Sequence, residues 1–181
     1  MVAVVLAWTG AFSASLAGAT TVRQDPTLHS EVLEDPYPGW QSLPEALLAQ
    51  DFGALAKAVG GNDYAFGGWL APDGRSLLLL VLLKLPGGYP PGLKGAPAYV
   101  RSQFANGVCK TNGGFRATYG VVGSGLSTMG WCKKQYEGGA LTFAAATTMT
   151  NRQVLLLSIG PHSLSESQLQ QIAKKQYPAV H

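Results

Sequence analysis

The hydrophobic pattern predicts a hairpin in the first half of the chain. Two strand-like runs, YAFGGWLA and SLLLLVLLKL, flank the turn sequence PDGR. Proline presets the first central position of such a turn, and glycine tolerates a positive φ. The second run has no polar alternation from Leu77 to Leu83. We therefore predict that both of its faces are covered and that it is a central strand.

Four further strand-like runs follow later in the chain. They are FRATYGVV, STMGWCKKQ, ALTFAAATTM and QVLLLSIG, at 115–122, 127–135, 140–149 and 153–160. The last two are joined by the short turn TNR, which predicts a second hairpin.

Three segments have helical spacing. Ser42 and Glu45 form a capping-box pattern before the apolar face of 42–59, and apolar residues recur at helical spacing in 98–108. The segment 163–177 has the same pattern at Ser163 and Glu166, then an apolar face and two lysines in its last turn, which suit the helix dipole. Its apolar face consists of Leu169, Ile172 and Ala173.

This order of elements predicts an α+β fold. It reads α-β-β-α-β-β-β-β-α, with an antiparallel sheet of about six strands and helices packed on it. Because hairpins dominate and strands do not alternate with helices, a parallel nucleotide-binding sheet is disfavoured. We predict one domain at 42–181, preceded by an extended lead-in at 20–41, where Tyr37 and Trp40 are candidates to pack onto the domain.

Composition restricts the class of partner. The 181 residues are 46% hydrophobic and 13% charged, and the net charge of +3 comes from scattered single charges with few basic doublets. Nucleic-acid-binding proteins usually have a basic stripe with interleaved aromatics, which this sequence lacks. We expect no nucleic-acid partner.

The first residues predict export. Residues 1–19 carry no charge, are apolar through Leu16 and end in Ala-Gly-Ala, a small-x-small pattern typical of signal-peptidase sites. The apolar run is shorter than the roughly 20 residues of a membrane span. We interpret it as a signal peptide, with a retained anchor as the alternative, and predict a secreted or cell-envelope location with no other transmembrane segment.

An exported chain with two cysteines favours a disulfide. Cys109 and Cys132 are the two, no CxxC motif is present, and the three histidines are far from either in sequence. Closing a loop of this length would stabilise the fold by about 3–4 kcal/mol in the chain-entropy model.

The glycine-rich run GVVGSG at 120–125 resembles a phosphate-binding loop. A dinucleotide fingerprint needs GxGxxG between a strand and a helix, whereas here the order is GxxGxG and a strand-like run follows. The chain also lacks a P-loop string. We therefore predict a hairpin connection and no nucleotide cofactor.

Catalytic and metal-binding motifs are weak. Ser124 fails the GxSxG pattern because Val122 occupies the position of the first glycine. His162, with Asp63 or Asp73 as a partner, is a conceivable base, although its position between a strand and a helix is typical of a loop residue. The acids lie in the lead-in, at helix starts or in turns, where solvation explains them. We predict no catalytic, cofactor or metal site.

Aromatic side chains are the remaining candidates for a binding surface. Single aromatics on half-buried strands more often pack in a core than line a pocket. With that alternative open, the candidate ligand or partner surface consists of Tyr64, Trp69, Tyr89 and Trp131.

The chain resembles PsbP/Mog1-type α+β domains over roughly 35–178. The resemblance lies in LTFAAATTMTNRQVLLLSIGPHSLSESQLQQIAKKQY and in the hairpin YAFGGWLAPDGRSLLLLVLLKL. The whole also looks like uncharacterised exported domains of actinobacteria. These are patterns of hydrophobicity, so they transfer no functional residue. The resemblance implies a non-enzymatic accessory or binding domain of the cell envelope.

The sequence therefore leads to one functional hypothesis and one alternative. The hypothesis is an exported, non-catalytic domain that binds a protein or a small ligand. The alternative is a secreted hydrolase that uses His162 or Ser124.

Overall fold

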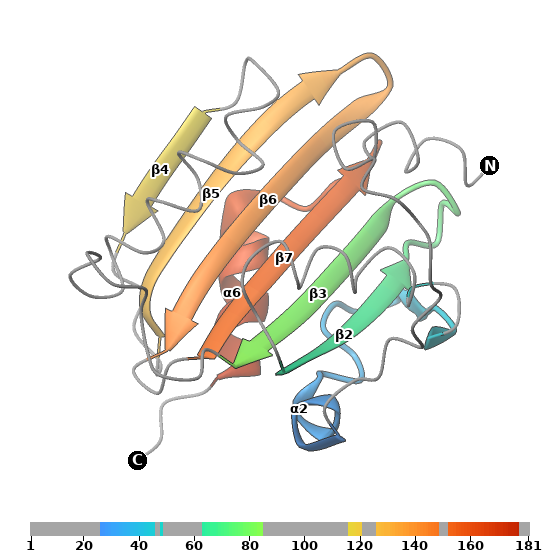
Figure 1. Cartoon of the computed structure of the whole chain (residues 1–181). Helices are drawn as coiled ribbons and strands as arrows, with labels where there is room; N and C mark the ends of the chain where they lie inside the picture. The colour runs from blue at the N-terminus through green and yellow to red at the C-terminus, as the bar shows by residue number, and fades with distance from the viewer. Residues whose placement is uncertain are drawn as a thin grey trace, which may run out of the picture.

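A computed structural model describes residues 26–45, 48, 63–84, 116–120, 126–148 and 152–177. The strands form one antiparallel sheet in the order β1-β2-β3-β7-β6-β5-β4 (Figure 1). Two helices are described beside it, α2 (Pro26–Glu31) and α6 (Glu166–Gln176). The predicted α+β class is confirmed. The strands are β1 (Gln41–Ser42), β2 (Asp63–Leu70), β3 (Leu77–Lys84), β4 (Arg116–Gly120), β5 (Leu126–Tyr136), β6 (Gly139–Thr148) and β7 (Arg152–Gly160).

Both predicted hairpins are confirmed. Strands β2 and β3 pair from Leu70↔Leu77 to Asp63↔Lys84 around the PDGR turn, and β6 pairs with β7 along most of its length. Strand β3 lies between β2 and β7, and its residues 78–83 are buried, as expected of a strand covered on both faces.

The glycine-rich run connects two strands. Strand β4 ends at Gly120, and β5 begins at Leu126 and pairs antiparallel with β4. The prediction of a hairpin connection is therefore confirmed, although residues 121–125 themselves lie outside the described part of the chain.

Three details of the predicted order are corrected. The lead-in contains the helix α2, and Ser42 belongs to the two-residue edge strand β1, which pairs with Leu70 and Trp69 of β2. The N-cap of α6 is Ser165, whose partner in the capping box is Gln168, and not Ser163 with Glu166. Most of the predicted helix 42–59 and all of 98–108 lie outside the described residues.

The core has a layer on each face of the sheet because successive side chains of a strand point to opposite faces. From β3, Leu78, Leu80 and Leu82 join the buried face of α6, whereas Leu79, Val81 and Leu83 join the other cluster. The predicted apolar face of α6 is confirmed, since Leu169, Ile172 and Ala173 are buried. Figure 1 shows α6 lying across one face of the sheet.

The segment that follows α2 packs on the same face as α6. Val32, Leu33, Tyr37 and Trp40 are half-buried against the cluster that contains Leu169 and Ile172. The prediction that Tyr37 and Trp40 pack onto the domain is confirmed. We call residues 32–42 the strap, because they run from α2 through β1 along this layer.

Candidate functional site

Two of the four aromatics predicted to form a surface lie in the core. Tyr64 is 6% exposed and Trp69 is 2% exposed, so they are corrected to packing residues. Both belong to β2, which lies between β1 and β3 in the sheet. Most of its residues are buried. Burial raises the pKa of the Tyr64 hydroxyl, which fits this position. Trp131 is half-buried against the α6 layer, and Tyr89 lies outside the described residues.

Cys132 is also a core residue. It is fully buried on β5, opposite Ala117 of β4 and Phe143 of β6. Its predicted partner Cys109 lies outside the described residues, so the disulfide between them stays a prediction.

An open groove of about 560 Å³ lies where the strap meets two turns. One turn follows β2 at 71–76, and the other follows β7 at 161–164. Aromatic, proline and polar side chains share its walls. The lining residues are Tyr37, Trp40, Ala71, Pro72, Asp73, Pro161, His162, Ser163, Leu164 and Gln168.

The aromatic wall is built by the strap. The rings of Tyr37 and Trp40 meet edge to face, with centroids 6.0 Å apart and planes at 81°. The backbone nitrogen of Trp40 donates to the carbonyl of Tyr37 at 3.3 Å, which closes a tight turn. A Cβ atom placed on Gly39 would lie 3.9 Å from Cγ of Pro72, so the strap abuts the opposite wall.

The acidic wall is the turn after β2. Oδ1 of Asp73 accepts hydrogen bonds from the backbone nitrogens of Arg75 and Ser76 at 2.8 and 2.9 Å. Oδ2 accepts one from the Ser76 hydroxyl at 2.8 Å. Burial raises the pKa of Asp73, but these hydrogen bonds and the interaction with His162 together lower it more, and the net pKa lies below the usual value of 3.8. Asp73 is therefore an anion at neutral pH.

The two turns are bonded to each other. The backbone nitrogen of His162 donates to Oγ of Ser76 at 2.8 Å, and Ser76 is fully buried. Gly160 makes this approach possible. Its φ is +128°, and a Cβ atom there would lie 2.6 Å from both the Arg75 carbonyl oxygen and the Ser76 Cα.

The imidazole of His162 stands at the mouth of the groove. Its Nε2 atom lies 3.8 Å from Oδ2 of Asp73, and its side chain is 74% exposed. This distance is too long for a hydrogen bond. Among the described hydroxyls, that of Ser76 is already bonded to Asp73, and that of Ser163 lies 3.3 Å from the hydroxyl of Thr142.

The strap is held in place by polar contacts along its length. Nε1 of Trp69 donates to the Glu34 carbonyl at 3.1 Å, and Nε2 of Gln168 donates to the Tyr37 hydroxyl at 2.5 Å. Further on, the backbone nitrogen of Leu43 donates to the Gly68 carbonyl at 2.8 Å, next to the β1–β2 pairing. The wall that carries Tyr37 and Trp40 is thus positioned from both ends.

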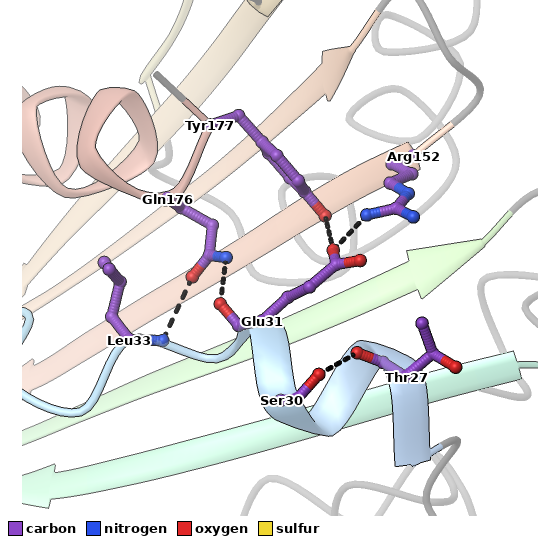
Figure 2. A network of polar contacts seen from close by, with 7 residues as sticks. All are labelled: Thr27, Ser30, Glu31, Leu33, Arg152, Gln176 and Tyr177. Carbon is purple, nitrogen blue, oxygen red and sulfur yellow. Dashed lines mark hydrogen bonds and ion pairs between the residues drawn. The ribbon is translucent and has the colours of Figure 1, made fainter. Parts of the chain in front are cut away.

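A polar cluster ties the N-terminal end of the strap to β7 and α6 (Figure 2). Glu31 forms an ion pair with Arg152 and accepts a longer hydrogen bond, 3.5 Å, from the Tyr177 hydroxyl. Gln176 donates to the Glu31 carbonyl at 2.6 Å and accepts from the Leu33 nitrogen at 3.3 Å. We call Glu31, Arg152, Gln176 and Tyr177 the clamp.

The pKa values of two clamp residues, Tyr177 and Arg152, are raised. Burial, followed by the charge of Glu31, raises the pKa of Tyr177 to about 12, against the opposing effect of Arg152. Burial lowers the pKa of Arg152, but its hydrogen bond to Glu31 and its interactions with Tyr177 outweigh this and raise the pKa overall. The guanidinium also lies 6.0 Å from the centre of the Tyr177 ring. Arg152 is therefore charged at all relevant pH values.

A second hollow of about 300 Å³ adjoins the groove. Tyr37 and Gln168 line both hollows and are joined by a hydrogen bond of 2.5 Å. The second hollow is otherwise lined by Pro36, Pro38, Gln171, Ile172 and Lys175.

The structure also bears on metal binding and membrane insertion. Within the described ranges, no three His, Cys, Asp or Glu side chains are grouped as metal ligands. In the same part of the chain, neither helix has the length and apolar character needed to cross a bilayer.

Sequence reasoning named Asp63 or Asp73 as a partner of His162 but did not join this pair to the other groove residues. Asp73 was a turn residue, His162 a loop residue, and Tyr37 and Trp40 packing residues of the lead-in. Their meeting depends on the long-range pairings of β1 with β2 and of β3 with β7, which no local motif encodes. No known protein-family model matches the chain, and a search of curated proteins found no significant match.

Proposed function

We propose that this chain is an exported, non-catalytic domain that binds a partner or small ligand at the cell envelope or outside the cell. The groove between the strap and the two turns is the proposed binding site. The observation that carries this proposal is the meeting of the Tyr37–Trp40 wall with the Asp73 turn in one open hollow.

The walls of the groove are held by contacts within the protein itself. The carboxylate of Asp73 is fixed by three hydrogen bonds, and the strap is bonded to β2, α6 and the clamp. Preorganised walls reduce the ordering of side chains that binding requires, so more of the interaction energy appears as affinity. This supports a role in recognition.

The export part of the proposal rests on residues 1–19. The resemblance to PsbP/Mog1-type domains agrees with an envelope role but supplies no site. Mass spectrometry of the intact exported protein tests the predicted cleavage after residue 19 and the predicted disulfide. We expect a mature N-terminus at Thr20 and a mass two hydrogens below that of the dithiol, from the disulfide between Cys109 and Cys132. Retention of residues 1–19 would support the anchor instead, and two free thiols would exclude the disulfide.

A secreted hydrolase is the second candidate, because Nε2 of His162 faces Oδ2 of Asp73. A triad also needs a nucleophile within hydrogen-bond reach of the imidazole. Ser76 is buried, and its hydroxyl is bonded to Asp73 and to the backbone of His162. Ser124 lies outside the described residues. The hydrolase predicts that His162→Ala abolishes hydrolysis of some ester or amide in an activity screen, whereas the binding role predicts no activity to lose.

A ligand screen with matched variants tests the binding role. Ligand-observed NMR on the exported protein would use a library of neutral saccharides, amines, carboxylates and short peptides. We expect some compounds to bind the wild type and the Tyr136→Leu control, whose aromatic is exposed and outside the groove, but to bind Trp40→Leu more weakly. Equal binding to all three proteins would place the site elsewhere and contradict the proposal.

A further inference from the structure

The charge and chemistry of the groove narrow its ligand class. Of the groove-lining residues in the described part of the chain, Asp73 is the one acid, and none is lysine or arginine. Asp73 therefore gives the groove a negative charge, and His162 faces its carboxylate from 3.8 Å, in a protein whose net charge is +3. None of these lining residues is a lysine or arginine that would offset the repulsion between Asp73 and an anionic ligand.

The beginning of α6 does not create an anion site beside the groove. The Ser165 nitrogen donates to Oε1 of Gln168, and the Gln168 nitrogen donates to Oγ of Ser165. Glu166 in the first turn places a negative charge at the positive end of the helix dipole. The two amides of this capping box are thus already bonded within the helix.

Asp73 has acceptor capacity left for a ligand. A carboxylate offers about four acceptor positions, and the described residues fill three of them. The side chain remains 20% exposed at the groove. The remaining position is on Oδ2, so a ligand donor that uses it approaches beside the imidazole of His162, 3.8 Å away, while the turn stays intact.

The aromatic wall suits a cation as well. The faces of tryptophan and tyrosine carry negative electrostatic potential and attract ammonium groups, and paired aromatics are a recurrent feature of sites for quaternary and methylated amines. Tyr37 and Trp40 stand nearly at right angles, which gives the hollow two differently oriented rings. An aromatic pair and a carboxylate in one hollow complement a positively charged alkylamine.

We propose that this groove binds small molecules that carry an alkylammonium group, with Trp40 and Tyr37 against the cation and Asp73 as its counter-ion. The inference rests on the proposed binding role of the groove and specifies the ligand class.

Choline and its neutral isostere, in which a tert-butyl group replaces trimethylammonium, form the matched pair of probes. We expect choline to bind about threefold to tenfold more tightly than the isostere, the range implied by cation–π attraction at a partly exposed site together with the carboxylate. Binding would be followed by amide chemical shifts of the exported protein. Equal affinities, or no response to choline, would overturn the proposal.

Two variants locate the cation site. Asp73→Asn keeps an oxygen for the two backbone amides but removes the charge, so choline binding should weaken while any binding of the isostere stays unchanged. Trp40→Leu should weaken choline binding more than isostere binding. Thermal unfolding of each variant confirms folding. Should Asp73→Asn be unfolded, Trp40→Leu and the isostere comparison still decide the question. Unchanged choline preference in folded variants would overturn the proposal.

The experiments distinguish a failure of the cation inference from a failure of the proposed binding role. If choline fails but neutral library members shift the amides of Trp40, Asp73 and His162, the cation inference is wrong and the groove remains a binding site. If no compound shifts these amides, both the inference and the proposed function fail.

Discussion

The Oγ atom of Ser76 lies 2.8 Å from the backbone nitrogen of His162, and this hydrogen bond joins the turn after β2 to the turn after β7. The same hydroxyl donates to Asp73, so one buried side chain connects both turns that line the groove. The bond requires the two turns to approach closely, and Gly160 is where they do so.

Gly160→Ala should therefore destabilise the protein and distort the groove. Its φ of +128° disfavours any side chain, and the new Cβ would lie 2.6 Å from backbone atoms of Arg75 and Ser76. We expect a loss of about 2–5 kcal/mol from strain and crowding together. Gly138→Ala is the control, because Gly138 also has a positive φ, +84°, but nothing lies within 4 Å of its Cβ position.

Urea unfolding of both variants measures the difference. The control should lose only about 1–2 kcal/mol, the cost of the left-handed backbone alone. Equal losses in the two variants would show that the approach of the turns at Gly160 has no energetic consequence.

Asp73 should make stability depend on pH in the acid range. Its pKa in the folded state lies below the usual 3.8, so its ionised form stabilises the fold above that value. This contribution should disappear as the pH falls through the lowered pKa. The difference in unfolding free energy between the wild type and Asp73→Asn should then be largest near neutral pH and shrink towards pH of about 2. A difference that does not change with pH would show that Asp73 titrates alike in both states.

Tyr177 should produce the opposite dependence in the alkaline range. Its pKa is raised from 10.0 to about 12, so the folded state favours the protonated hydroxyl. That contribution is complete below pH 10 and is lost as the pH rises from about 10 to about 12. Tyr177→Phe should lose less stability than the wild type over this interval in denaturant titrations. Identical alkaline profiles would contradict the burial of the Tyr177 hydroxyl beside Glu31.

The clamp should couple Glu31 to Arg152. Their side chains are 26% and 29% exposed, so solvent screens the pair in part. A double-mutant cycle with Glu31→Gln and Arg152→Gln should give a coupling energy of about 1 kcal/mol in urea unfolding. Mutations at this pair should also loosen the strap and weaken ligand binding at the groove. A coupling energy of zero would mean that the clamp does not anchor the strap.

The structure and the sequence pattern give different N-cap residues for α6, Ser165 and Ser163 respectively. Ser165→Ala should cost about 1 kcal/mol, because Oγ of Ser165 accepts from the Gln168 nitrogen. Ser163→Ala, at the cap position that the sequence pattern favoured, should cost less, since the Ser163 hydroxyl contacts Thr142 instead. A larger loss for Ser163→Ala in thermal or urea unfolding would restore the sequence-based cap.

This cap shows where local patterns reach their limit. Ser163, Ser165 and Ser167 alternate, so the sequence offers several registers for the helix start. The choice depends on tertiary contacts, because Leu164 is buried and its backbone nitrogen donates to Oγ of Ser158 on β7. The periodicity of Leu169, Ile172 and Ala173 was sufficient to predict the helix and its buried face.

The same distinction between local pattern and tertiary contact applies to the strands and to the strap. Leu77 to Leu83 form an apolar run without polar alternation, and this pattern predicted a strand covered on both faces. By contrast, Trp69 and Tyr64 were aromatics on a strand whose buried faces depend on the strap and on neighbouring strands. The strap itself was missed as a structural unit, since Val32, Tyr37 and Trp40 have no regular spacing and pack through contacts with distant residues.

The central claim is that the groove between the strap and the two turns binds a ligand. Amide chemical-shift mapping of the exported protein, titrated with the compounds that respond in the ligand screen, tests it most directly. The account predicts that the largest shifts cluster at Trp40, Asp73, His162 and Gln168, and that Trp40→Leu reduces them. Shifts that cluster around β4 and β5 instead, with those four amides unmoved, would contradict it.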